Sequence, residues 1–193
     1  MIKIRNYTEL VTFILIYMYI NEYKRAFMQV YVKLVLILFQ NLFVIRSSNM
    51  ASVYDVAKYI LEQQGVMTAM KLQKLVYYSQ VWSLVWDEEE LFNENIEAWA
   101  NGPVAPELYA IHRGLYNLDG IKEGNISNIT LNQKETIEIV LKTYGKKTSQ
   151  WLSDRTHSES PWQEARKKAN TEEGDRCNEV ITTASMMEYY SSL

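Results

Sequence analysis

The feature that most limits the possible fold is how few residues in this sequence interrupt a helix. The 193 residues include only seven glycines and three prolines, well below the roughly 12% that these two types together average in proteins. Proline breaks helix interiors and glycine weakens them, so long helical segments are free to form. We therefore predict a mainly α fold, a single compact multi-helix domain with at most a short extended segment or small hairpin near residues 91–104.

The chain is predicted to turn sharply between residues 99 and 109, where two of the three prolines lie. Pro103 fixes its own φ and pushes Gly102 away from the α region. Pro106 suits the first turn of a helix, because its missing N–H would have no partner there. We predict a rigid corner, followed by a helix over residues 106–116.

Helix caps and apolar spacing predict the other helices. Ser52 followed by Asp55 resembles a capping box, and Gly65 is placed to end the first helix. Thr68 begins a second helix, whose apolar stripe is the best core candidate and whose other side carries Lys71, Lys74 and Tyr78. Residues 118–127 are expected to form a loop. Later helices are expected after Thr130, after Thr148, from Pro161-Trp162 and over residues 181–190.

The first 49 residues differ in composition from the rest of the chain. They contain no Gly, Pro, Asp, Trp or Cys and a single alanine, and Ile, Leu, Val, Tyr, Phe, Asn and Lys dominate them. AT-rich codons specify most of these types, and Met50-Ala51-Ser52 then resembles a start. We interpret residues 1–49 as an atypical hydrophobic basic extension, a mis-called start or a dispensable segment, and residues 50–193 as the functional domain.

Two other interpretations of the extension stay open, a membrane-associated hairpin and a genuine helical subdomain. Residues 11–20 form an apolar run of ten, and residues 30–45 are interrupted by three polar residues. A membrane-spanning helix needs about 20 predominantly apolar residues, so a membrane-tethered interaction protein is the weaker alternative.

The net charge of −3 hides an asymmetry. Residues 1–49 carry six Lys/Arg against two Glu, and residues 50–193 carry 14 basic against 21 acidic residues, which gives net charges of +4 and −7. Nucleic-acid binders carry a basic footprint, so direct nucleic-acid binding is not expected and a basic protein partner suits this body better. The single cysteine cannot form an intrachain disulfide, and we expect a reducing, cytoplasmic setting.

No motif in the sequence indicates catalysis or a cofactor. Two histidines and one cysteine are too few for a structural zinc site, and neither a glycine-rich phosphate loop nor a nucleophile elbow occurs. We expect no metal, no cofactor and no enzyme. The enzymatic alternative is a nucleophilic pair of Cys177 and His157, although a lone cysteine is more often an inert buried residue and His157 is expected to pin a loop.

Three segments carry a resemblance to a known family. They are the run Lys71-Leu72-Gln73-Lys74-Leu75-Val76-Tyr77-Tyr78-Ser79-Gln80, the corner with Ala98-Trp99, Gly102-Pro103-Val104 and Leu108-Tyr109, and Thr156-His157 followed by Pro161-Trp162. In this order and spacing they resemble the Panacea domain, an antitoxin family that includes SocA-like and phage-associated GepA-like proteins. The resemblance covers about residues 52–190.

The resemblance implies a mostly helical, non-enzymatic module from a prophage setting. Panacea antitoxins neutralise small toxins by direct binding, and SocA-like members act as proteolytic adaptors that deliver the toxin to the ClpXP protease. The implied partners are therefore a cognate toxin and, in the adaptor mode, ClpXP. The candidate partner-binding positions, each of which could instead belong to the core, are Lys71, Gln73, Lys74, Tyr77, Tyr78, Trp99, Gly102, Pro103, Val104, Tyr109, Thr156, His157, Pro161 and Trp162.

Overall fold

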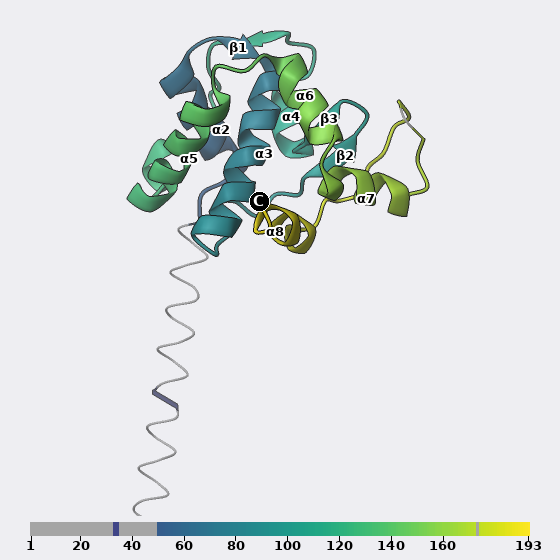
Figure 1. Ribbon diagram of the computed structural model, residues 1–193. Helices are drawn as coiled ribbons and strands as arrows, with labels where there is room; N and C mark the ends of the chain where they lie inside the picture. The colour runs from purple at the N-terminus through teal and green to yellow at the C-terminus, as the bar shows by residue number, and fades with distance from the viewer. Residues whose placement is uncertain (1–32, 35–49, 173) are drawn as a thin grey trace, which may run out of the picture. The chain divides into compact units, whose positions relative to one another are not determined.

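The computed structural model describes residues 33–34, 50–172 and 174–193 (Figure 1). The chain divides into two units, and the second, Met50–Leu193, is mainly α, as predicted. The interpretation of residues 1–49 as a dispensable extension falls almost entirely outside the described residues and stays a prediction. Within the described residues, no helix is both long enough and apolar enough to cross a membrane.

The second unit contains α-helices, a short 3₁₀ helix and four short strands. The α-helices are α2 (Val53–Gln64), α3 (Ala69–Trp86), α4 (Pro106–His112), α5 (Leu131–Tyr144), α6 (Ser149–His157), α7 (Ser160–Lys168) and α8 (Thr183–Tyr190). The 3₁₀ helix is η1 (Ile126–Asn128), and the strands are β1 (Met67–Thr68), β2 (Glu97–Trp99), β3 (Gly102–Val104) and β4 (Asn117–Leu118).

The helix starts follow the capping residues of the sequence. Ser52 and Asp55 form a reciprocal capping box before α2, and Gly65, at φ +72°, follows its end. The Thr68 hydroxyl accepts a hydrogen bond from a backbone N–H in the first turn of α3, and Thr130 opens α5 through a second capping box. These contacts satisfy N–H groups that have no partner inside the helix, so the predicted starts are confirmed.

The strands form two small antiparallel pairs. β2 pairs with β3 in the register Glu97↔Val104, Ala98↔Pro103 and Trp99↔Gly102, which confirms the hairpin expected near residues 91–104. β1 pairs with β4 through Met67↔Leu118 and Thr68↔Asn117. This second pair was not predicted, because strands of two residues carry no periodic signal.

Helix α3 runs through the middle of the unit and is buried on nearly every side (Figure 1). It packs against α2, α5, α6, α8 and β3. Lys74 and Tyr78, which lie away from the predicted apolar stripe, are 1% and 0% exposed. The sequence left open whether these positions face a partner or the core, and they are buried because neighbouring elements cover both faces of this helix.

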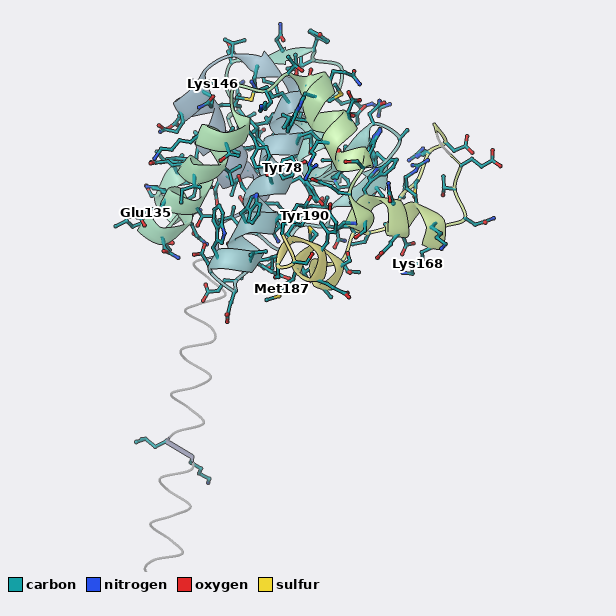
Figure 2. All side chains as sticks on the ribbon, viewed as in Figure 1. Tyr78, Glu135, Lys146, Lys168, Met187 and Tyr190 are labelled. Atoms are coloured by element: carbon teal, nitrogen blue, oxygen red, sulfur yellow. The ribbon has the colours of Figure 1, made fainter. Side chains whose placement is uncertain are left out.

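A buried carboxylate ties the C-terminal helix to α3. Glu159 accepts hydrogen bonds from the hydroxyls of Tyr78 and Tyr190, and Arg155 Nε lies 3.0 Å from its Oε1. Figure 2 shows both tyrosines in the interior, whereas Lys168 lies at the periphery. Burial raises the pKa of Glu159 above its ordinary value, against the effect of these donors.

Two boundaries differ from the prediction. The helix after the corner ends at His112 rather than near residue 116, since Arg113 leaves the helical region and Gly114 follows at φ +87°. Thr156 and His157 were expected in a loop and instead form the last turn of α6.

Replacing Gly102 with alanine is expected to destabilise the protein by about 2–4 kcal/mol. Gly102 has φ +99°, and a Cβ there would lie 2.7 Å from Lys74 Cε and 2.8 Å from Thr156 Oγ1. Gly114→Ala is the matched control, because φ is also positive and no atom lies within 4 Å of the added carbon, so only about 1–2 kcal/mol should be lost. Urea unfolding measures both, and equal losses would contradict the close approach.

Candidate functional site

Gln80 of α3 fixes the chain where it enters the corner. Its Oε1 accepts hydrogen bonds from the backbone N–H groups of Leu91 and Phe92 at 2.9 and 3.2 Å, and its Nε2 donates to the Phe92 carbonyl at 3.0 Å. All these groups are buried. The amide therefore replaces the strand partner that this extended segment lacks.

Two further α3 side chains fix the chain where it leaves the corner. Gln73 Oε1 accepts from the Ala105 N–H at 2.9 Å, and its Nε2 lies 3.0 Å from His112 Nε2. Lys74 Nζ donates to the Pro103 carbonyl at 3.0 Å. Because Gln73 and Gln80 are seven residues apart, they lie on one face of the helix, two turns from each other.

The third motif holds the hairpin from the other side. Trp162 Nε1 donates to the Trp99 carbonyl at 2.9 Å, and Arg166 Nη1 donates to the Ala98 carbonyl at 3.0 Å. Ser153 Oγ donates to the Asn101 carbonyl at 2.9 Å. Three segments that are distant in the sequence therefore meet at the β2–β3 hairpin.

Most of the motif residues serve the core. The buried positions are Gln73, Lys74, Tyr77, Tyr78, Gly102, Pro103, Val104, Thr156, Pro161 and Trp162. The partly exposed positions are Lys71, whose Nζ donates to the Gly145 carbonyl, Trp99, Tyr109 and His157. The assignment of the motif residues to partner binding stays a prediction. Because ten of them are buried, mainly the partly exposed motif residues can contact a partner directly.

A pocket of about 660 Å³ lies against the hairpin. Its walls come from the start of α3, the corner, the end of α4 and the loop before residue 178. Trp99 and Tyr109 meet edge to face in its wall, with ring centroids 4.8 Å apart. The lining residues are Ala69, Met70, Gln73, Lys74, Trp99, Ala100, Asn101, Val104, Tyr109, His112, Arg113, Gly114, Leu115, Gly174, Arg176 and Cys177.

The pocket is lined by a lysine and a histidine whose pKa values are lowered by burial. Desolvation lowers the pKa of Lys74 to about 7, because a buried ammonium loses its hydration. Burial also lowers the pKa of His112, so this ring is neutral at pH 7. His112 is 3% exposed, because Gln73 and Tyr109 contact the ring.

Several residues that line the pocket were not among the predicted partner-binding positions. They are His112, Arg113, Leu115 and Arg176. They belong to no recognisable motif, and only the chain's path around the corner brings them together. Cys177 and His157, the nucleophilic pair of the enzymatic alternative, line different pockets. Cys177 lines this pocket, and His157 lines another one with Trp162. Among the described residues, no group of three or more His, Cys, Asp or Glu side chains could hold a metal ion.

The comparisons with known proteins identify one family. Residues 72–163 match the sequence model of the antitoxin SocA-like, Panacea domain. This range begins in α3, contains the whole corner and ends in α7, so it includes nearly all of the contacts described above. No curated protein and no solved structure matches the chain significantly.

Lys74→Met is expected to change how stability depends on pH. The pKa of Lys74 falls from 10.5 in the unfolded chain to about 7 in the folded protein, so the unfolded state binds more protons between these values. The free energy of unfolding of the wild type should therefore rise relative to the variant as pH increases from 7 towards 10.5, by up to ~1.4 kcal/mol per pH unit. Chemical denaturation at pH 7, 8 and 9 measures this, and parallel curves would contradict a desolvated Lys74.

Proposed function

We propose that this chain, which belongs to the SocA-like Panacea-domain antitoxin family, is the antitoxin of a type II toxin–antitoxin system and neutralises a cognate toxin by binding it directly. The family match supports the antitoxin role. The direct binding of a toxin is our proposal, and so is the surface that performs it.

The observation that carries the proposal is the position of the pocket. Two family motifs line it, through Gln73 and Lys74 of α3 and through Trp99 and Tyr109 of the corner. Motif residues that only filled the core would not require an open concave surface beside them. Clefts with aromatic walls and a few polar groups are the usual form of a binding site.

Exposed apolar side chains border the pocket. Leu115, which also lines it, is 56% exposed, and the neighbouring Tyr116 is 79% exposed. The Tyr116 carbonyl accepts a hydrogen bond from the Ala69 N–H at 2.9 Å, so its backbone is fixed against α3. A large exposed aromatic on a fixed backbone loses little conformational freedom when a partner covers it, and aromatic residues are enriched in interfaces.

The acidic body suits a basic toxin. Residues 50–193 carry a net charge of −7, which accelerates encounter with a partner of opposite charge. Simple occlusion of the toxin and delivery to ClpXP are two versions of the same binding role. They differ in whether the host protease is required.

Neutralisation is expected to depend on the apolar border. We expect a small open reading frame adjacent to this gene that, induced alone, arrests growth, and co-expression of the full chain should restore growth. Tyr116→Glu should weaken this rescue, because it places a charge where we expect an apolar contact. Leu131→Glu is the matched control, since Leu131 is 75% exposed at the start of α5. Equal rescue by both variants would reject this surface, and a neighbouring gene that is harmless when induced alone would contradict the proposed antitoxin role.

The protease requirement separates the two versions. Rescue in a host that lacks ClpXP is expected if binding alone blocks the toxin. Loss of rescue in that host, with the toxin still bound in a pull-down, would instead assign the adaptor role.

A further inference from the structure

The pocket differs in charge from the body that surrounds it. Lys74, His112, Arg113 and Arg176 line it, and no Asp or Glu is among its described lining residues. The rest of the unit is acidic overall, with 21 acidic against 14 basic residues in 50–193. A cluster of basic groups with no Asp or Glu among its described lining residues, inside an acidic protein, is a feature that the binding of a basic partner does not explain.

Lys74 lacks a counter-charge. Its side chain is 1% exposed, and within the described part of the chain it takes part in no ion pair. The Pro103 carbonyl accepts one hydrogen bond from Nζ, whereas an ammonium has three donors. Burying such a group without a paired charge is costly, and a ligand that brings a negative charge would offset that cost.

The two arginines lie where a ligand could reach them. Arg113 follows α4 and Arg176 lies in the loop before Cys177, and both are exposed. The rings of Trp99 and Tyr109 form an apolar part of the same lining. The pocket volume of about 660 Å³ falls within the range of about 300–1,000 Å³ that is usual for ligand pockets.

We propose that this pocket receives a carboxylate of the bound toxin, from an acidic side chain or the C-terminus, with Arg113 and Arg176 at its mouth, Lys74 at its base and the attached apolar group against Trp99 and Tyr109. This inference rests on the proposed toxin-binding function and adds the chemistry of the contact. The acidic body attracts the toxin as a whole, and the basic pocket selects one acidic group on it. An acidic surface with one basic pocket fixes the orientation of a complex more strictly than a surface with a single sign of charge.

Charge reversal at the mouth tests the proposal. The double variant Arg113→Glu, Arg176→Glu alters two exposed side chains and should weaken binding of the product of the adjacent open reading frame at least tenfold, measured by isothermal titration calorimetry with the full chain. The control is Lys142→Glu, Lys146→Glu, which makes the same change of charge at two exposed positions in and after α5. The control should bind within about twofold of the wild type.

Proton uptake tests whether the carboxylate reaches Lys74. At pH 8 a lysine with a pKa of about 7 is mostly neutral, and a nearby carboxylate would raise this pKa, so that binding takes up close to one proton. Calorimetry in buffers of different ionisation enthalpy measures this number. It should fall to near zero in Lys74→Met, although the variant has the same overall fold by circular dichroism.

Other titratable groups also lie at the pocket, and a variant of His112 serves as the control in the same experiment. His112 faces it from α4 and Cys177 from the loop, and Glu97 bonds the indole of Trp99 beside it. His112→Gln should leave the proton uptake at pH 8 unchanged, because this histidine is neutral at that pH. Uptake lost in His112→Gln and kept in Lys74→Met would overturn the assignment to Lys74.

The outcomes separate this inference from the proposed function. If the wild type does not bind the toxin, the proposed function fails. If the wild type binds and the Arg113/Arg176 double variant binds equally well, without proton uptake in either, toxin binding stands and the carboxylate pocket is rejected. If the double variant and the Lys142/Lys146 control weaken binding to the same extent, overall charge explains the loss and the pocket is again rejected.

Discussion

Two buried glutamine amides determine how the rest of the unit is arranged. The segment from Leu91 to Ala105 contains the β2–β3 hairpin, and the N–H groups of Leu91, Phe92 and Ala105 lie outside these strands. Gln80 satisfies the entering end with three hydrogen bonds, and Gln73 satisfies the leaving end. An unpaired buried amide costs about 1–3 kcal/mol, so the corner can adopt this path only where α3 presents these two side chains at the correct spacing.

This constraint explains why the three motifs occur together. Trp162, Arg166 and Ser153 donate hydrogen bonds from α6 and α7 to carbonyl groups of the β2–β3 hairpin and its turn. The first and third motifs therefore satisfy backbone groups of the corner. These contacts also fix the pocket wall. The Trp99 carbonyl accepts a hydrogen bond from Trp162, and the Trp99 indole donates one to Glu97.

Local signals in the sequence were sufficient for the helix starts and for the corner. Ser52-Asp55, Thr68 and Thr130 act within three residues of their partners, and Pro103 restricts φ without help from the fold. Lys74 could not be placed in the same way. A charged side chain on a helix is predicted to face solvent. Lys74 is buried because neighbouring elements surround α3. The same limit applies to Arg113 and Arg176, which the path of the chain brings to one pocket from positions 63 residues apart in the sequence.

The burial of Lys74 connects the stability of this fold with its proposed role. The ammonium lies under the corner, where Gly102 leaves room for it and where a larger residue would not. At neutral pH the lysine is divided between its charged and neutral forms, so the free protein carries a desolvation cost that a methionine would not impose. A partner that supplies the missing negative charge would recover the cost on binding, and the affinity gained would be specific to partners that place a carboxylate at this position.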